Sequence, residues 1–147
     1  MNVFPRLTTH SVLVVFLSVL VAACAHSQTD EMNITDVVWQ PVWFDGSQSP
    51  ENPEGGGKAH LRLKDGRVQG SGGCNLIAGE YFLTGSQISF SKLISTRRAC
   101  IAGMEQEYAF LKALEKVSTW KRQDNLLRFY DMDERLVLEL EAAKDPQ

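Results

Sequence analysis

Residues 101–117 read IAGMEQEYAFLKALEKV, and this stretch decides the fold class of the chain. Its apolar side chains recur at steps of three or four, the spacing of one face of an α-helix: Ile101, Met104, Tyr108, Leu111 and Leu114. No clear Ser, Thr, Asp or Asn cap precedes them, so the sequence does not define the first helical residue. We therefore expect one amphipathic helix, in a chain whose other segments show a different period.

The segments on either side of this helix have an apolar period of two, which is typical of half-buried β-strands. Asp65-Gly66 is a strong hairpin signal between two such segments, and residues 84–87 (TGSQ) separate two more. Pro41 predicts an edge or a break in the first core segment, because proline cannot donate a ladder hydrogen bond. We expect strands at 37–44, 60–64, 67–69, 81–83, 88–90, 119–121, 126–130 and 135–140. These elements predict an α+β fold, with a twisted antiparallel sheet or small open β-barrel packed on one amphipathic helix.

The N-terminal segment is an export signal by its layout. Residues 11–23 (SVLVVFLSVLVAA) carry no charge, and they are shorter than the roughly 20 apolar residues that a membrane span needs. We therefore expect residues 1–23 to be a cleaved signal peptide. Residues 20–24 (LVAAC) resemble the bacterial lipobox, which implies that Cys24 is lipidated and becomes the first mature residue. The alternative is an ordinary secretory signal that is cleaved near Ala23 or Ala25.

A lipidated Cys24 predicts a protein that is held on a membrane without spanning it, because two or more acyl chains anchor a protein stably. Ala25 follows, and by resemblance to the sorting rules of enteric bacteria a residue other than Asp there favours the outer membrane. We expect a bacterial envelope protein that faces the periplasm, with residues 24–36 as the lipidated N-terminus and a polar tether.

Cleavage of 23 of the 147 residues leaves 124, with 18 acidic and 14 basic side chains. This length supports one compact domain, which we place at residues 37–142. The acidic balance argues against a nucleic-acid partner.

Two cysteines remain in the mature chain besides Cys24. Thiols that reach an oxidising compartment usually pair, so we expect a structural disulfide between Cys74 and Cys100. A redox-active or metal-binding pair is the alternative. The chain has no Cys-x-x-Cys spacing, and neither His26 nor His60 offers a convincing third ligand, so we predict no metal site and no cofactor.

Residues 70–75 (GSGGCN) match neither a phosphate-binding loop nor a nucleophile elbow, and their glycines favour a tight bend. The acidic pairs Glu105/Glu107 and Asp131/Asp133 are interpreted as solvated surface positions. Residues 96–98 (TRR) could bind an anion, although exposed turn charges are the simpler interpretation. With no credible triad or carboxylate pair, the sequence predicts a protein that is not an enzyme.

The order of these motifs resembles the META domain of the HslJ-like bacterial lipoproteins. The matching residues are Ser71, Gly72, Gly73, Cys74, Asn75, Gly79, Tyr81, Thr96, Cys100, Glu107, Phe110, Leu114, Trp120 and the segment 126–130. Two positions depart from the family pattern: Arg98, where methionine is frequent, and Ile101, where proline or alanine is frequent. The resemblance covers residues 37–142 and implies antiparallel strands around one helix.

The same resemblance implies exposure in the envelope, an association with heat or antibiotic stress, and no settled activity. The leading hypothesis is a non-enzymatic binding or structural role in envelope stress tolerance, with an envelope protein or an apolar ligand as partner. The alternatives are a thiol-based redox protein that uses Cys74 and Cys100, and an inhibitor of an envelope hydrolase that presents the 47–57 loop.

Overall fold

The computed structural model describes residues 33–44, 46–48, 57–101 and 103–143. The predicted signal peptide, the lipidation site at Cys24, most of the tether and most of the 47–57 loop lie outside the described residues. The helix that is described does not combine the length and the apolar character needed to cross a bilayer.

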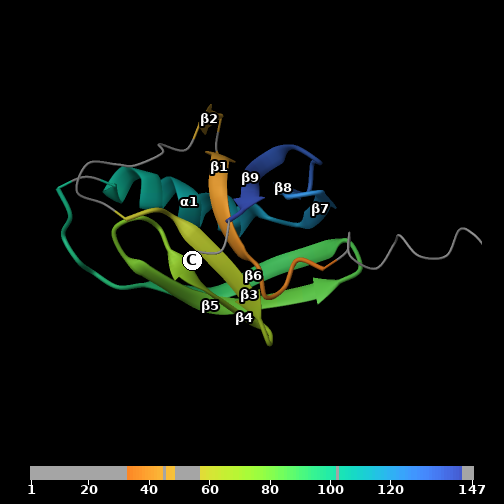
Figure 1. The fold of residues 1–147 in the computed structure, drawn as a ribbon, viewed down its shortest axis with the longest axis horizontal. Helices are drawn as coiled ribbons and strands as arrows, with labels where there is room; N and C mark the ends of the chain where they lie inside the picture. Colours follow the sequence, from red (N-terminus) through yellow and green to blue (C-terminus); the bar gives the residue numbers. More distant parts are fainter. Residues whose placement is uncertain (1–32, 45, 49–56, 102, 144–147) are drawn as a thin grey trace, which may run out of the picture. The chain divides into compact units, whose positions relative to one another are not determined.

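The described chain forms one helix and a continuous antiparallel sheet (Figure 1). The strands are β1 (Val38–Phe44), β2 (Ser47–Gln48), β3 (His60–Lys64), β4 (Arg67–Ser71), β5 (Leu76–Thr84), β6 (Gln87–Ser95), β7 (Thr119–Gln123), β8 (Leu126–Tyr130) and β9 (Leu136–Ala142), with α1 (Met104–Lys116) between β6 and β7. Eight strands pair in the order β1-β3-β4-β5-β6-β7-β8-β9, and a β1–β9 pairing closes them into a ring. The predicted α+β architecture is confirmed.

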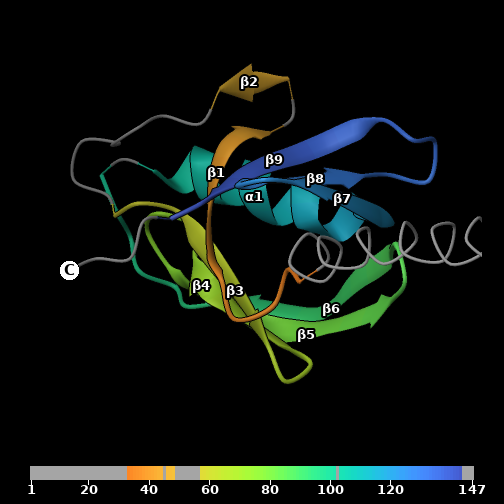
Figure 2. The ribbon, with the colours of Figure 1, turned by 45° about the vertical axis from the view of Figure 1, so that its right-hand side comes forward.

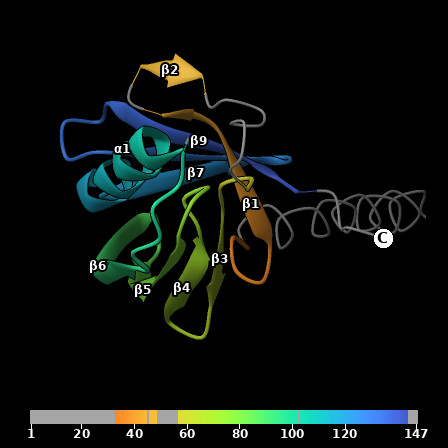
Figure 3. The ribbon, with the colours of Figure 1, turned by 90° about the vertical axis from the view of Figure 1, so that its left-hand side faces the viewer.

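Helix α1 packs against the ring through contacts with β1, β6 and β9 (Figure 2). Strands β6 and β7 share the shortest pairing of the ring, which consists of one position, Gln87 opposite Thr119. Figure 3 shows the helix beside β7 and β9 and above β5 and β6. The helix therefore lies near the part of the ring where neighbouring strands share the fewest paired positions.

Packing of the helix on the sheet corrects the predicted apolar face. Phe110 and Leu114 are fully buried, and the Phe110 ring lies 6.3 Å from the ring of Phe44. The sequence predicts Ile101, Met104 and Tyr108 on the buried stripe, but Ile101 precedes the helix and the three residues are 106%, 53% and 65% exposed. The inner face instead runs through Gln106, Glu107, Phe110, Ala113 and Leu114, so polar residues occupy its first turn.

Both hairpin predictions are confirmed. β3 and β4 are joined by Asp65-Gly66, whose φ angles of 50° and 75° are those that a two-residue hairpin turn needs. β5 and β6 are joined at Gly85-Ser86. In β3, Leu61 and Leu63 point into the core while Arg62 and Lys64 are exposed, as the period of two requires.

Strand β1 shows why Pro41 is tolerated in the sheet. β1 pairs with β3 at Val38–Trp39, with β2 near Phe44, and with β9 along most of its length. At Pro41 itself, β1 is paired with β9 and not with β3 or β2. The β1–β9 register shifts directly after Pro41. The predicted break is thus an irregularity in register. Residues 47 and 48, which the sequence assigns to a loop, form the short strand β2.

The end of the predicted tether belongs to the folded domain. Ile34 is fully buried, and its carbonyl accepts a 2.9 Å hydrogen bond from Nε1 of Trp39. Asp36 lies 2.8 Å from Arg62 and 3.2 Å from Lys64, and hydrogen bonds from Lys64 and Arg62 hold the pKa of Asp36 below its usual range. A single isoleucine in a polar segment carries no period, which is why the sequence did not place it in the core.

Candidate functional site

The glycine motif connects β4 to β5 by a tight bend. The backbone N–H of Gly72 donates to the carbonyl of Asn75 over 3.0 Å, and the N–H of Gly73 donates to Oγ of Ser71 over 3.0 Å. Gly73 has a φ of 111°, in the left-handed region that favours glycine. The interpretation of this motif as a bend is therefore correct.

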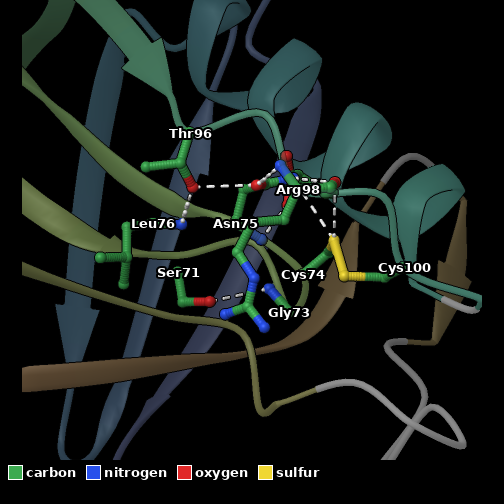
Figure 4. The surroundings of a disulfide bond; sticks show 9 residues. Ser71, Gly73, Cys74, Asn75, Leu76, Thr96, Arg98 and Cys100 are labelled. Atoms are coloured by element: carbon green, nitrogen blue, oxygen red, sulfur yellow. Dashed lines mark hydrogen bonds between the residues drawn. A yellow bond between two sulfur atoms is a disulfide. The ribbon is translucent and has the colours of Figure 1, made fainter.

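The side chain of Asn75 holds the segment that follows β6 (Figure 4). Its Oδ1 accepts hydrogen bonds from Oγ1 of Thr96 (2.9 Å) and from the backbone N–H of Arg98 (2.7 Å). Its Nδ2 donates to the carbonyl of Arg98 over 3.3 Å. Asn75 is only 4% exposed, so these bonds stand in for water and extend the β5–β6 pairing beyond the strand ends.

Glu107 of α1 is the second buried polar residue of this cluster. It is 7% exposed, and its Oε2 accepts a 2.6 Å hydrogen bond from the backbone N–H of Asn75. A Cβ atom added at Gly72 would lie 2.4 Å from Cγ of Glu107, so only glycine leaves room for this side chain. The prediction that Glu107 is a solvated surface carboxylate was wrong, because its face of the helix turns toward the glycine bend.

The disulfide between Cys74 and Cys100 completes the cluster, as the sequence predicts. The sulfurs are 2.00 Å apart, and the Cα atoms are separated by 6.0 Å. The bond ties the glycine bend to the segment that enters α1 (Figure 4). Within the described residues, no group of three His, Cys, Asp or Glu side chains could hold a metal ion.

The remaining motif residues lie in or against the core rather than at a surface site. Tyr81 packs against the core and Phe110 and Leu114 are part of it. At Gly79, an added Cβ would lie 2.9 Å from Cδ2 of Leu93, so the glycine allows close packing of β5 on β6. The motif thus combines a hydrogen-bonded bend, a disulfide and core packing.

Two pockets lie on the described surface. The smaller, of about 320 Å³, adjoins the disulfide and is lined by Gly57, Ser71, Gly73, Cys74, Leu76, Thr96, Arg98 and Cys100. The larger, of about 610 Å³, lies between the β5–β6 hairpin, the end of α1 and the β8–β9 turn. Its lining includes Phe82 and Met132, which are 78% and 88% exposed. We call this the hairpin pocket.

The β8–β9 turn at the hairpin pocket is ordered by charge. Arg135 lies 2.9 Å from a carboxylate oxygen of Asp131 and 2.6 Å from one of Asp133. The backbone N–H of Arg135 also donates to Asp131, and this bond, with the adjacent guanidinium, lowers the pKa of the Asp131 carboxyl. The sequence missed the pocket, although three successive apolar residues, Tyr81-Phe82-Leu83, imply that one must face outward on a strand.

Comparison with the models of known protein families identifies the family of this chain. The profile of the META domain matches residues 32–144. The chain belongs to the META domain family. The resemblance inferred from its motif order is therefore confirmed.

Solved structures share the fold of this META domain. An NMR structure of a protein from Burkholderia xenovorans is 24% identical, with a TM-score of 0.61, over 76% of this chain and 84% of that one. A crystal structure of a DUF4847 family protein from Bacteroides vulgatus is 16% identical, with a TM-score of 0.56, over 77% and 96% of the two chains. At these identities the likeness shows the fold alone. No curated protein matches the chain in sequence.

Proposed function

We propose that this META domain protein is anchored in the bacterial envelope through a lipid on Cys24 and acts there by binding, without catalysis. The lipobox-like residues 20–24 and the apolar run before them support the anchor and an outer-membrane location that faces the periplasm. The association of the family with heat or antibiotic stress supports a role in stress tolerance. The partner is an envelope protein that inserts an apolar side chain into the hairpin pocket.

The exposure of Phe82 and Met132 carries this proposal. Large apolar side chains that are 78% and 88% exposed at one pocket mark a surface that is stabilised when a partner covers it. The carboxylates of the lining are ion-paired, Glu115 with Lys112 and the two aspartates of the β8–β9 turn with Arg135, so the apolar side chains are the unpartnered groups of this surface.

The chemistry of the glycine cluster supports binding rather than catalysis. The buried polar groups, Asn75 and Glu107, hydrogen bond to one another and to the neighbouring backbone. Both thiols of the described chain are joined in the disulfide. These groups stabilise the fold, and a nucleophile or general base would have to come from elsewhere.

Site-specific photo-crosslinking in the native envelope tests the binding surface. A benzophenone side chain replaces Phe82 or Met132 in the full lipidated protein, and the matched control replaces Tyr108, an aromatic residue that is 65% exposed and does not line the pocket. The proposal predicts that positions 82 and 132 capture the same envelope protein and that position 108 does not. Equal capture from all three positions, or capture from position 108 alone, would contradict it.

The accessibility of Cys100 supports a test of one alternative function, that of a thiol-based redox protein. It is half-buried and lines the small pocket, so a reductant can approach the disulfide. A thiol-based redox protein would be reduced by mild dithiol while folded, and would then react with a thiol reagent.

The hydrolase-inhibitor alternative depends on the 47–57 loop, and most of this loop lies outside the described residues.

A further inference from the structure

The small pocket beside the disulfide holds a cation that no described carboxylate neutralises. Arg98 lines this pocket, and none of the ion pairs among the described residues includes it. We propose that this pocket binds a small carboxylate whose adjacent carbons are apolar. This site is separate from the hairpin pocket and does not depend on the proposed function.

The backbone of Arg98 is fixed in place, so its side chain starts from a defined point. Its N–H donates to Oδ1 of Asn75 over 2.7 Å, and its carbonyl accepts from Nδ2 of the same side chain over 3.3 Å. Figure 4 shows the guanidinium reaching past Asn75 toward Ser71 and Gly73. The fixed backbone keeps the guanidinium within reach of this pocket, and the contact with the anion must outweigh the ordering of the exposed side chain.

Ser71 supplies a second donor. Its Oγ accepts the backbone N–H of Gly73 over 3.0 Å, and no described acceptor takes the hydroxyl proton. The proton can therefore point into the pocket. The hydroxyl of Thr96 is already committed, because it donates to Asn75 over 2.9 Å.

The volume of the small pocket, the charge of Arg98 and the apolar side chain of Leu76 define the class of ligand. A volume of about 320 Å³ is near the lower limit for small-molecule pockets, which suits a carboxylate and one short apolar group. A single guanidinium matches the planar, singly charged carboxylate in a two-point contact. Leu76 is 66% exposed on the same pocket and offers the apolar group its contact.

Two sources carry this chemistry: the C-terminus of a peptide that ends in an apolar residue, and a free branched aliphatic acid. The test uses the full chain, labelled with nitrogen-15 and held in detergent micelles. It is titrated with N-acetyl-leucine, with 4-methylpentanoate, which has the same side chain without the amide, and with N-acetyl-leucinamide, which lacks the charge. The readout is the chemical shift of the backbone amides of Ser71, Gly73 and Leu76.

We expect saturable shifts with a carboxylate and at least tenfold weaker binding of N-acetyl-leucinamide. Tighter binding of N-acetyl-leucine supports a peptide C-terminus, and equal or tighter binding of 4-methylpentanoate supports a free acid. Arg98→Gln should weaken carboxylate binding at least tenfold, and Arg98→Lys severalfold, because lysine keeps the charge but loses the two-point contact.

Arg97→Gln is the matched control, because it removes the same charge at an adjacent exposed position that does not line the pocket. It should leave the affinity unchanged within twofold. Unchanged unfolding midpoints in urea show that Arg98→Gln and Arg98→Lys remain folded. The absence of saturable shifts, equal binding of the leucinamide, or an equal loss in Arg97→Gln would overturn the proposal.

Discussion

The backbone N–H of Asn75 donates a 2.6 Å hydrogen bond to Oε2 of Glu107, and both residues are almost completely buried. This bond joins the bend after β4 to helix α1, across a separation of 32 residues. Because buried polar groups cost free energy when they have no partner, each residue makes the burial of the other tolerable. The glycine motif and the helix are therefore one structural unit.

Removal of the Glu107 carboxylate should destabilise the domain. In Glu107→Ala the N–H of Asn75 loses its acceptor inside the protein, which costs about 1–3 kcal/mol. Glu107→Gln keeps an amide oxygen at the same reach and should cost about 1 kcal/mol, the difference between a charged and a neutral acceptor. Urea unfolding measures both. A Glu107→Ala variant as stable as the wild type would show that the bond contributes nothing.

A methyl group at Gly72 should have a similar effect for a steric reason. Gly72→Ala places Cβ 2.4 Å from Cγ of Glu107, so the helix or the bend must move, at a cost of about 1–3 kcal/mol. Gly57→Ala is the matched control, since its Cβ would lie 3.4 Å from the carbonyl oxygen of Gly73, an ordinary contact. Thermal unfolding should separate the two variants clearly. Identical midpoints would mean that the Gly72–Glu107 packing is looser than described.

Loss of the disulfide should lower stability by an amount set by the loop that it closes. The bond spans a sequence separation of 26, and closure of such a loop in the unfolded chain corresponds to about 3.5 kcal/mol. We expect Cys74→Ala with Cys100→Ala to lose about that free energy of unfolding. We also expect the wild-type bond to resist mild dithiol in the folded state. A readily reduced bond, with little change in stability, would instead favour the redox alternative.

The turn between β8 and β9 should make stability depend on acid pH. The pKa of Asp131 is lowered in the folded state by the backbone N–H and the guanidinium of Arg135, so the unfolded chain binds this proton more readily. Its contribution is therefore complete above the unfolded pKa and is lost as the pH falls through the lower folded pKa, below about 4.

Asp131→Asn should reduce stability at neutral pH and flatten the decline below pH 4. Urea unfolding from pH 2.5 to 7 measures both effects. Asp124→Asn, at an exposed position in a different turn and with no ion pair among the described residues, should keep the decline. A decline in Asp131→Asn as steep as in the wild type would show that other carboxylates cause it.

Local signals in the sequence predicted the strands and turns well. Asp65-Gly66 specifies a hairpin by its own conformational preference, and the alternation around Leu61 specifies which face is buried. The inner face of α1 was predicted only in its second half. Glu107 looks like a solvated helix residue until the bend at Gly72 is placed against it.

The hairpin pocket could not be predicted, because three distant segments build it. Phe82, Val117 and Met132 meet only when the ring closes and α1 lies across it. Within its own segment, each of these residues fits the local sequence pattern and gives no sign of a pocket. Their combination depends on the pairing of β6 with β7 and on the β8–β9 turn, which no local pattern specifies.

Survival of stressed cells tests the central claim most directly, since the claim is that the hairpin pocket binds a partner that the envelope needs. Cells that lack the gene are complemented with the full lipidated protein as wild type, as Phe82→Ser with Met132→Ser, or as the control Tyr108→Ser, and are challenged with heat or an envelope-active antibiotic. Equal membrane levels of the three proteins are verified first. The account predicts that the wild type and Tyr108→Ser restore survival and that the double variant does not. Full restoration by the double variant would contradict it.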